Sequence, residues 1–391
     1  MSRAEHESWM REALAEARRG WGDTHPNPMV GALIVEDGRA VAVGHHARAG
    51  GPHAEIAALN ALGRKPWEGA TLYVTLEPCS TQGRTPPCTE AIIASGIRRV
   101  VAGATDPNPS HAGRGFNILR EFGIDVMTGV LADECEDLNL IFNHWITKGR
   151  PLVAAKVATS LDGRIAARSG ESKWITGEAA RADVMRWRRL FPAIAVGSGT
   201  VATDDPQLTV RAAGTETCPA RFIFDGSLGT AALNPAPRVI SDAHAARTTF
   251  VTLDSADPIA VASLEENGVR VWRLPGVDGE VDFDAFLARC AEENLTGVLV
   301  EGGSRTISGL LRQRRIDYLL SYRAPILFAD AMAVPMATGL AIDSPGDAIR
   351  LERVRHATFG DDQMIRGFLH YPEVLPPDDA AIEHERRHGH R

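Results

Sequence analysis

Before residue 148, segments with the hydrophobic pattern of a helix alternate with segments that have the pattern of a strand. Met10, Leu14 and Ala17 recur at helical spacing among charged residues, which predicts an amphipathic helix near the start. Asp37-Gly38 lies between two apolar runs and is typical of a tight β-hairpin. Strands are predicted over 29–35, 40–44, 70–78 and 98–106, and helices over 53–62, 88–96 and 113–123. Strands that alternate with helices in this way predict a layered α/β domain.

A second α/β pattern begins after the short polar segment 148–151, which marks the predicted domain boundary. Further strands are predicted from 151 onward and over 193–197, 220–225 and 297–303, and a helix over 304–315. The two halves share a class but no repeated motif. The pattern therefore predicts two domains, 1–149 and 151–371. A Pro-rich and then charged tail over 372–391 is expected to be flexible.

Composition narrows the class of protein. With 44% hydrophobic and 24% charged residues in 391, the chain has the composition of a soluble globular protein. Its formal net charge of −8 argues against a nucleic-acid partner, which normally requires a basic face. Five cysteines, few and odd in number, fit a reducing compartment. The charged N-terminus does not resemble a signal peptide, and no apolar run approaches the roughly 18 residues of a membrane span. We therefore expect a cytoplasmic protein without a membrane partner.

One cluster of residues indicates a specific chemistry. His53, Cys79 and Cys88 provide the one nitrogen and two sulfur ligands of a catalytic zinc site that keeps a position for water. Glu55 follows His53 by two residues, about 200° around a helix, so the two converge only if the helix directs its N-terminus at the metal. Zinc would lower the pKa of its water to about 7, and Glu55 would act as the catalytic acid and base. The pattern indicates a zinc deaminase.

Simpler interpretations exist when each of these residues is taken alone. His53 and Glu55 are compatible with an ordinary helix start, and the two cysteines with packed apolar side chains. A structural zinc site normally has four protein ligands, and no fourth Cys or His follows at suitable spacing. The cysteines are separated by eight residues, not by two as in the general deaminase motif, which makes room for a loop over 80–87.

Longer motifs resemble one known family. A resemblance to the deaminase half of the bifunctional riboflavin-pathway deaminase/reductases of bacteria is carried by HPNPMVGALIVEDG, GGPHAEIAAL, ATLYVTLEPCSTQGRTPPCTEAII and DPNPSHAGRG. A resemblance to the reductase half is carried by KVATSLDGRIA, SGESKWIT, GTVATDDPQLTVR and VEGG, so it covers about residues 8 to 371. It implies an α/β protein with a three-layer cytidine-deaminase-like domain followed by a dihydrofolate-reductase-like domain.

The resemblance also implies a reaction. The deaminase would act on 2,5-diamino-6-ribosylamino-4(3H)-pyrimidinone 5′-phosphate and replace its 2-amino group with oxygen. The reductase would then convert the ribosyl group to ribityl with NADPH, giving 5-amino-6-ribitylaminouracil 5′-phosphate. Zn²⁺ and NADPH are the implied cofactors, and a small phosphorylated pyrimidine is the implied substrate. We expect the chain to form a homo-oligomer.

Site residues of the reductase are implied by matching positions of the family. The cofactor-binding positions are Ala158, Trp174, Thr200, Asp204, Ser227 and Gly303. The substrate-binding positions are Ser172, Arg188, Leu208, Arg211 and Glu301. Arg188 and Arg211 are expected to hold the 5′-phosphate as bidentate donors, and Trp174 to offer a flat face to nicotinamide. The glycine turn at 302–303 suits a phosphate, although a plain tight turn would look the same. Lys156 and Asp204 are the candidates for the proton step.

Three positions depart from the family pattern. Thr81 stands where a His is frequent, Tyr318 where an acidic residue is usual, and Phe328-Ala329 where a Gly is frequent. None of them removes a zinc ligand or Glu55, but they leave open an active deaminase with an impaired reductase. A nucleic-acid base deaminase is a further alternative, which the acidic charge and 6% aromatic residues disfavour. A reductase with a structural zinc and a non-catalytic protein with a decayed site also remain open.

Overall fold

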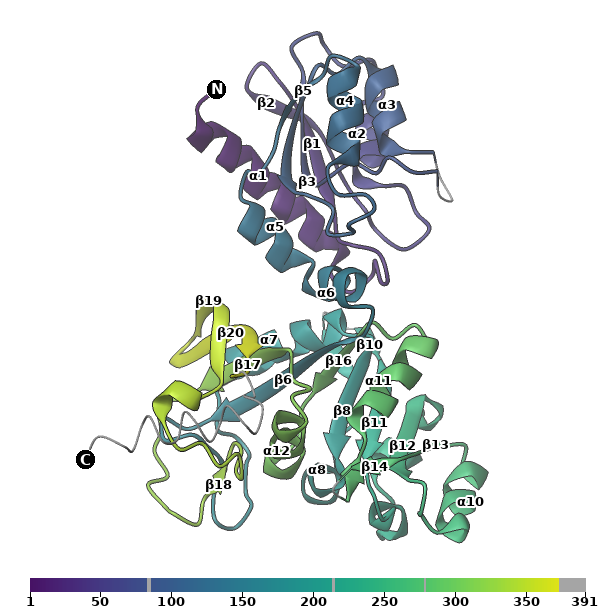
Figure 1. The fold of residues 1–391 in the computed structure, drawn as a ribbon, viewed down its shortest axis with the longest axis vertical. Helices are drawn as coiled ribbons and strands as arrows, with labels where there is room; N and C mark the ends of the chain where they lie inside the picture. Colours follow the sequence, from purple (N-terminus) through teal and green to yellow (C-terminus); the bar gives the residue numbers. More distant parts are fainter. Residues whose placement is uncertain (83–85, 213–214, 278, 373–391) are drawn as a thin grey trace, which may run out of the picture.

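The computed structural model describes residues 1–82, 86–212, 215–277 and 279–372. Two α/β units follow one another along the long axis of the molecule, with helix α6 (Leu140–Lys148) between them (Figure 1). The predicted tail beyond Pro372 and part of the predicted loop over 80–87 lie outside the described residues. Within the described ranges, no helix combines the length and apolarity needed to cross a bilayer.

The first unit is built on a five-stranded sheet. Its elements are α1 (Arg3–Ala17), η1 (Arg18–Gly20), β1 (Gly31–Glu36), β2 (Arg39–His45), α2 (Ala54–Leu62), β3 (Thr71–Leu76), α3 (Cys88–Ser95), β4 (Arg99–Ala104), α4 (Arg114–Glu121), β5 (Asp125–Met127) and α5 (Ala132–Leu138). The strand order is β2-β1-β3-β4-β5, with β1 antiparallel to both neighbours and β3, β4 and β5 parallel. The predicted hairpin is confirmed: Asp37 and Gly38 both have positive φ, 45° and 69°, as this tight turn requires.

Helices cover both faces of the first sheet (Figure 1). Leu14 of α1 and Leu138 of α5 belong to one core cluster, and Ala58 of α2, Ile92 of α3 and Phe116 of α4 belong to another. β1 and β3 are buried along their whole length because each face of these strands meets a layer of helices. The predicted three-layer arrangement is confirmed.

The second unit is built on a nine-stranded sheet. Its elements are β6 (Leu152–Thr159), β7 (Arg164–Ala166), α7 (Glu178–Leu190), β8 (Ala193–Gly197), α8 (Ser198–Asp204), β9 (Val210–Ala212), β10 (Thr215–Thr217), β11 (Ala220–Phe224), η2 (Gly229–Ala232), α9 (Arg238–Ser241), η3 (Ala245–Arg247), β12 (Thr248–Leu253), α10 (Pro258–Glu266), β13 (Arg270–Leu274), β14 (Gly276–Val277), β15 (Glu280–Val281), α11 (Phe283–Glu292), β16 (Gly297–Val300), α12 (Ser304–Arg312), β17 (Tyr318–Arg323), β18 (Val334–Pro335), η4 (Pro345–Asp347), β19 (Arg350–Phe359) and β20 (Asp362–His370). The strand order is β13-β12-β11-β8-β16-β6-β17-β20-β19, parallel as far as β17 and antiparallel at the β20–β19 edge.

Alternate residues of the central strands enter two different cores. Leu152 and Ala154 of β6 join the cluster that includes Trp187 of α7, whereas Val153 and Ala155 join the cluster of α11 and α12. Successive side chains of a strand point to opposite faces, so helices cover this sheet on both sides as well. A mainly parallel sheet covered on both faces confirms the predicted α/β class of the second unit.

Helix α6 joins the two units and packs into the second. Leu140 and Ile141 belong to the same core cluster as Trp187 and Leu299. The helix ends at Gly149, which has φ 67°, and β6 begins at Leu152. The predicted break at 148–151 therefore falls between two elements, but the apolar packing of the second unit begins one helix earlier.

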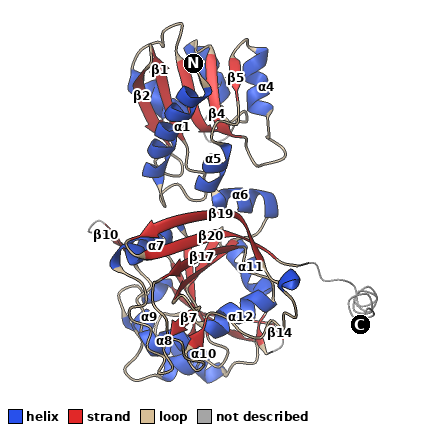
Figure 2. Ribbon diagram, turned by 90° about the vertical axis from the view of Figure 1, so that its left-hand side faces the viewer, coloured by secondary structure: helices blue, strands red, loops and turns tan. Residues whose placement is uncertain are grey.

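Two groups of contacts join the two units. Asp137 of α5 pairs with Arg366 of β20 at 2.6 Å, and Figure 2 shows the edge strands β19 and β20 below α5 and α6. Elsewhere, Trp21 donates from its Nε1 to the carbonyl of Arg186 at 2.8 Å. Its ring lies edge-on to that of Trp187, with centroids 5.6 Å apart. The segment after α1 is thus anchored on α7 of the second unit.

Candidate active sites

The metal ligands predicted from the sequence converge on one point. His53 is the N-cap residue of α2, Cys79 follows β3, and Cys88 opens α3. The Nδ1 of His53 lies 3.2 Å from the Sγ of Cys88 and 3.5 Å from the Sγ of Cys79. All three ligand atoms lie within 4.8 Å of one another, and no second group of this kind occurs in the part of the chain that the structure describes.

These separations fit a tetrahedral zinc ion. Bonds of about 2.0–2.3 Å to nitrogen and sulfur place neighbouring ligands roughly 3.5–3.8 Å apart, and three protein ligands leave one position for water. The backbone N–H of Cys88 donates to the Sγ of Cys79 at 3.2 Å, which stabilises negative charge on that sulfur. Hydrogen bonding between the two thiols lowers the pKa of Cys79 and raises that of Cys88.

Glu55 is a buried carboxyl group beside these ligands. It lies in the first turn of α2, with His53 at the helix tip, and is 3% exposed. Burial raises the pKa of Glu55 to about 7. A carboxyl group with such a pKa exchanges protons readily at neutral pH, which general acid/base catalysis requires. The geometry predicted from the two-residue spacing is confirmed.

Two neighbours of the zinc ligands were not singled out from the sequence. The ring of His46 lies edge-on to that of His53, with centroids 5.6 Å apart, and its Nδ1 lies 3.0 Å from the carbonyl of Pro52. The Nε2 of His46 lies 3.2 Å from the Nδ2 of Asn27. Asn27 belongs to the HPNP segment, which is one of the motifs that carry the family resemblance. The sequence did not show that the fold places Asn27 beside His46.

A cavity of about 170 Å³ opens next to Cys79. Its wall includes Thr81, Asn108 and His111 from loops of the first unit, and Phe142 from α6. Because α6 packs into the second unit, the wall of this cavity is completed by a helix that the second unit holds in place.

Glu77 organises the loop 106–115 in that wall. Its carboxylate accepts hydrogen bonds from the backbone N–H groups of Asp106, Gly113 and Gly115, at 3.1, 2.9 and 2.8 Å. A Cβ added to Gly115 would lie 2.2 Å from a backbone carbonyl, so glycine is required for this close approach. Glu77 therefore positions the cavity wall.

The predicted cofactor positions are spread over the ends of several strands of the second sheet. Ala158 lies near the end of β6, Thr200 lies in α8 directly after β8, and Gly303 lies between β16 and α12. A Cβ added to Gly303 would come 3.7 Å from the Oγ1 of Thr200, so these two positions are neighbours. α12 begins without a side-chain cap, and its first-turn N–H groups are available to an anion. The turn therefore fits a dinucleotide phosphate.

The other predicted cofactor positions make local contacts. Asp204 accepts a hydrogen bond at 3.3 Å from Ser172, a predicted substrate position. The Trp174 side chain is 69% exposed, with the guanidinium of Arg181 4.6 Å from its ring centroid. Ser227 donates to Asp225 at 3.2 Å. Trp174 is thus exposed but has Arg181 over its ring, whereas Ser227 is tied to its own turn.

A buried cluster of charges links the predicted substrate positions. Arg188 donates twice to Glu301, from Nε at 2.6 Å and from Nη2 at 3.0 Å. The Nζ of Lys156 lies 3.8 Å from the same carboxylate. Burial alone would raise the pKa of Glu301, but the two cations lower it to about 2. Burial also lowers the pKa of Lys156, against the attraction of Glu301.

The structure differs from the sequence-based expectation for Arg188. Its fork is filled by Glu301, and its Nη1 donates to the carbonyl of Thr209 at 3.1 Å. It therefore presents no free fork for a bidentate contact with a phosphate. Arg211 is exposed and bonds only the side chain of Gln207 among the contacts described. Of the two predicted arginines, Arg211 is the one open to a phosphate.

Comparison with known proteins decides the family. Residues 3–104 match the cytidine and deoxycytidylate deaminase zinc-binding region, and residues 151–365 match the RibD C-terminal domain. The riboflavin biosynthesis protein RibD of Aquifex aeolicus is 39% identical over 365 residues, which cover 93% of this chain and 99% of that protein. The chain belongs to the RibD family. The RibD protein of Escherichia coli is 38% identical over 363 residues, with 90% of this chain and 96% of that protein covered.

Solved structures of RibD proteins share the whole architecture. Acinetobacter baumannii RibD superposes with a TM-score of 0.76 at 34% identity, covering 94% of this chain and 100% of that one. The deaminase/reductase of Thermotoga maritima gives the same TM-score and identity, covering 94% and 99%. The expected pair of a cytidine-deaminase-like and a dihydrofolate-reductase-like domain is confirmed. The chain is a bifunctional deaminase and reductase of riboflavin biosynthesis that uses zinc and NADPH.

The residues that depart from the family pattern line the cavity or make structural contacts elsewhere. Thr81 lines the cavity beside the zinc ligands. Tyr318 is buried, and its hydroxyl accepts a hydrogen bond from Arg366 at 2.6 Å. Ala329 has φ 49°, the left-handed conformation that favours glycine, and its N–H donates to Asp162 at 3.0 Å. None of these contacts involves a zinc ligand, Glu55 or the buried Glu301.

Proposed function

We propose that the first domain deaminates 2,5-diamino-6-ribosylamino-4(3H)-pyrimidinone 5′-phosphate. The second domain then reduces the ribosyl group to ribityl, giving 5-amino-6-ribitylaminouracil 5′-phosphate. The Thermotoga maritima relative bears the name of a diaminohydroxyphosphoribosylaminopyrimidine deaminase and 5-amino-6-(5-phosphoribosylamino)uracil reductase, which supports this pair of substrates. The observation that carries the proposal is the convergence of His53, Cys79 and Cys88 beside the buried Glu55, in one chain with a RibD reductase domain.

Deamination requires a nucleophilic water and a group that moves protons. A zinc ion held by His53, Cys79 and Cys88 supplies Lewis-acid chemistry that makes water nucleophilic at neutral pH. Glu55 accepts one proton from the attacking water and passes it to a ring nitrogen. It then takes the second proton from the hydroxyl group added to the ring and delivers it to the amino group, which leaves as ammonia. Its raised pKa, about 7, suits both the acceptance and the release of a proton.

The cavity next to Cys79 is the proposed place for the substrate of this step. It lies against one metal ligand and offers the amide of Asn108 and the ring of His111 to polar groups of the pyrimidine and its sugar phosphate. Thr81, the departure from the family pattern, contributes a hydroxyl to the same wall. Phe142 closes the cavity on its apolar side.

Reduction requires a bound hydride donor and a proton source. NADPH supplies the hydride, and we assign it the cofactor set Ala158, Trp174, Thr200, Asp204, Ser227 and Gly303. We assign the pyrimidine the substrate set Ser172, Arg188, Leu208, Arg211 and Glu301. Arg211 binds the phosphate, whereas Arg188 acts by fixing the orientation of Glu301. Lys156 is the proposed proton donor because burial lowers its pKa and so makes its ammonium group a stronger acid, with Asp204 as the alternative.

The proposed domains are 1–149 and 151–371. The end of α6 at Gly149 supports this division, while the packing of Leu140 and Ile141 with the second unit means that a separated reductase should retain α6. We also propose that the enzyme is a cytoplasmic homo-oligomer that needs neither nucleic acid nor membrane. Its acidic net charge supports the absence of a nucleic-acid partner.

Two measurements on the purified full-length protein test the proposed function. Ammonia release from the diaminopyrimidine should depend on zinc and stop with a strong chelator. Mass spectrometry should find the deaminated ribosyl compound without NADPH and the ribityl compound with it. Ammonia release that continues in metal-free protein would contradict the deaminase mechanism.

The alternative of an impaired reductase makes a different prediction. In that case the deaminated ribosyl compound accumulates even with excess NADPH. The intact contacts of Glu301 with Arg188 and Lys156 favour an active reductase, because the predicted substrate positions keep their charged partners.

A further inference from the structure

Arg221 is a buried arginine whose donors are all used within the second domain. Its side chain has no exposed surface. It lies on β11 beside Thr248 of β12, and its Nε donates to the Oγ1 of Thr248 at 2.9 Å. Nη1 donates to Asp242 at 2.7 Å and to the carbonyl of Gln207 at 2.9 Å. Nη2 donates to Asp242 at 2.8 Å and to the carbonyl of Val239 at 3.0 Å. All five N–H groups of the guanidinium therefore have an acceptor.

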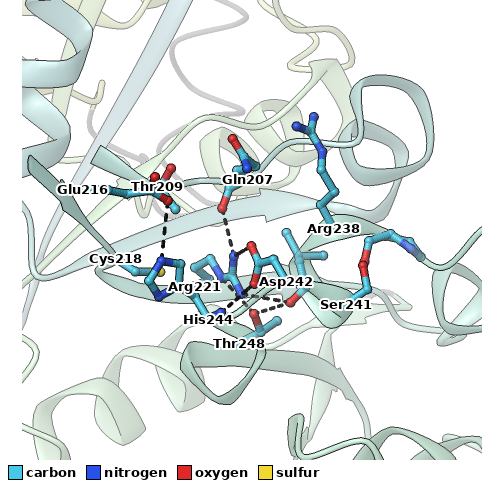
Figure 3. A network of polar contacts seen from close by, with 12 residues as sticks. Gln207, Thr209, Glu216, Cys218, Arg221, Arg238, Ser241, Asp242, His244 and Thr248 are labelled. Carbon is cyan, nitrogen blue, oxygen red and sulfur yellow. Dashed lines mark hydrogen bonds and ion pairs between the residues drawn. The ribbon is translucent and has the colours of Figure 1, made fainter. Parts of the chain in front are cut away.

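Asp242 provides the charge that balances this arginine. Its Oδ1 also accepts from the backbone N–H of His244 at 2.9 Å. Burial would raise the pKa of Asp242, but the hydrogen bonds from Arg221 lower it, so the carboxyl group stays ionised. Figure 3 shows the guanidinium between Gln207 on one side and Thr248 on the other. A fully bonded buried pair holds the segments around it in one geometry, and loss of one partner leaves an unpaired buried charge.

The contact with Gln207 connects Arg221 to the reductase site. Gln207 precedes Leu208 in the loop between α8 and β9. Arg221 holds the carbonyl of Gln207, and Arg188 holds the carbonyl of Thr209. Leu208, between them, is 2% exposed and has φ 54°, a left-handed conformation that persists only where the surroundings hold it. Two arginines, each paired with an acid, therefore fix the backbone on both sides of Leu208.

A second, weaker contact holds the start of the same loop. Asp205 accepts from the backbone N–H of Arg238 at 2.8 Å and from its Nε at 3.0 Å. Both side chains are about half exposed, so this pair contributes less than the buried pair of Arg221 and Asp242. Arg238 opens α9, the short helix that also provides Val239 to Arg221. The segment 238–242 thus contacts the loop directly through Arg238 and indirectly through Arg221.

We propose that Arg221 is a positioning residue for the reductase substrate: through Gln207 it holds the loop 204–211, in which Leu208 is buried, so that Arg211 faces the pyrimidine phosphate. This inference rests on the proposed function, which assigns Leu208 and Arg211 to the substrate. Lysine cannot replace Arg221, because an ammonium group presents its donors from one atom and cannot reach all of these acceptors at once.

The test is steady-state kinetics of Arg221→Lys in the full-length enzyme. With the deaminated pyrimidine as substrate, we expect its KM to rise about tenfold, because a loop displaced from its productive geometry binds less well, while the KM for NADPH changes less than about twofold. Ammonia release by the first domain should be unchanged in the same preparation. A merely structural role would lower the thermal midpoint and the active fraction without separating the two KM values.

Arg238→Ala provides a second variant that removes only an exposed side chain. We expect it to raise the same substrate KM about two- to fivefold, in keeping with a half-exposed pair. Arg270→Lys is the matched control. Arg270 also bonds a strand threonine and an acid, Thr249 and Glu293, but makes no described contact with the loop. Its two KM values should equal those of the unmodified enzyme.

The outcomes separate this inference from the proposed function. Arg211→Ala, measured in parallel, must raise the substrate KM, and failure to do so overturns the assignment of the loop to the substrate. If Arg211→Ala behaves as expected but a folded Arg221→Lys leaves the substrate KM unchanged, or raises both KM values equally, the positioning role of Arg221 is overturned. If Arg221→Lys does not fold, Arg238→Ala decides: an unchanged substrate KM overturns the proposal.

Discussion

The two sites of this enzyme are built on different principles. The zinc site draws its ligands from residues 53–88, at helix starts and strand ends, and its ligand atoms converge within 4.8 Å. The reductase site draws its predicted residues from 158–303 and depends on ion pairs such as Arg188–Glu301. A metal ion needs a few rare side chains at short range. A hydride-transfer site uses common side chains, whose roles depend on what holds them.

This difference has consequences for the response to substitution. Loss of a zinc ligand should abolish one reaction and leave the other intact, because the metal supplies chemistry that no neighbour replaces. Loss of a single reductase contact should weaken substrate binding only partly, because several residues contribute to it. The following predictions test this contrast, from the largest expected effect to the smallest.

Cys88→Ser should remove the zinc and abolish deamination. A serine hydroxyl does not ionise near neutral pH, so the site would lose one of its two anionic ligands. Metal analysis and ammonia release measure both effects, and reduction of supplied deaminated substrate should continue. Cys218→Ser, at a half-buried cysteine away from the site, is the matched control. A full complement of zinc in Cys88→Ser would exclude Cys88 as a ligand.

Glu55→Gln should keep the zinc but lower the rate of deamination. The loss should be about 10²–10⁴-fold, because the amide cannot accept and return a proton. The combination of normal metal content and a large fall in kcat distinguishes this residue from a ligand. Reduction in the other domain serves as the internal control. Deamination at a rate near that of the unmodified enzyme would remove Glu55 from the mechanism.

His144 in α6 should make the joint between the two units sensitive to mild acid. Burial lowers its pKa to about 4, with Arg150 and Lys148 adding to the shift and Asp317, 3.7 Å away, opposing it. In the unfolded chain this histidine binds a proton near its ordinary pKa of 6.5, so proton uptake favours unfolding. The free energy of unfolding should therefore fall between pH 6.5 and 4, by up to about 3 kcal/mol.

Denaturant unfolding between pH 8 and pH 5 measures this effect. His144→Gln, which cannot titrate, should lose part of the pH dependence that the unmodified protein shows. His370→Gln, at an exposed histidine of β20, is the matched control and should keep it. Equal pH dependence of the free energy of unfolding in all three proteins would show that His144 does not cause it.

Arg211→Ala should give the smallest effect. The KM for the deaminated pyrimidine should rise about tenfold with little change in kcat, because a phosphate contact contributes mostly uniform binding. The KM for NADPH should stay close to its original value. A larger rise for NADPH than for the pyrimidine would move Arg211 to the cofactor side and blur the contrast between the two sites.

Much of the fold was predictable where the local pattern was strong. The strand predicted over 193–197 has the same bounds as β8, and the hairpin predicted at Asp37-Gly38 forms there, with positive φ at both residues. Other elements gave too little signal. α5 buries only Cys135 and Leu138 of its seven residues, and no residue of the edge strand β19 is fully buried. A pattern of apolar residues cannot reveal an element that buries so little.

The sequence by itself predicted the zinc ligands and Glu55, because their chemistry requires rare residue types at fixed ends of local elements. Tertiary structure alone decided the role of Arg188, whose fork is filled by a carboxylate 113 residues away in the chain. Tertiary structure also decided the place of α6, which belongs to the predicted first domain by sequence but packs with the second unit. Such contacts depend on which segments the completed sheets bring together. The spacing of residues along the sequence does not show which segments meet, because an arginine can pair equally with a phosphate or with a buried acid.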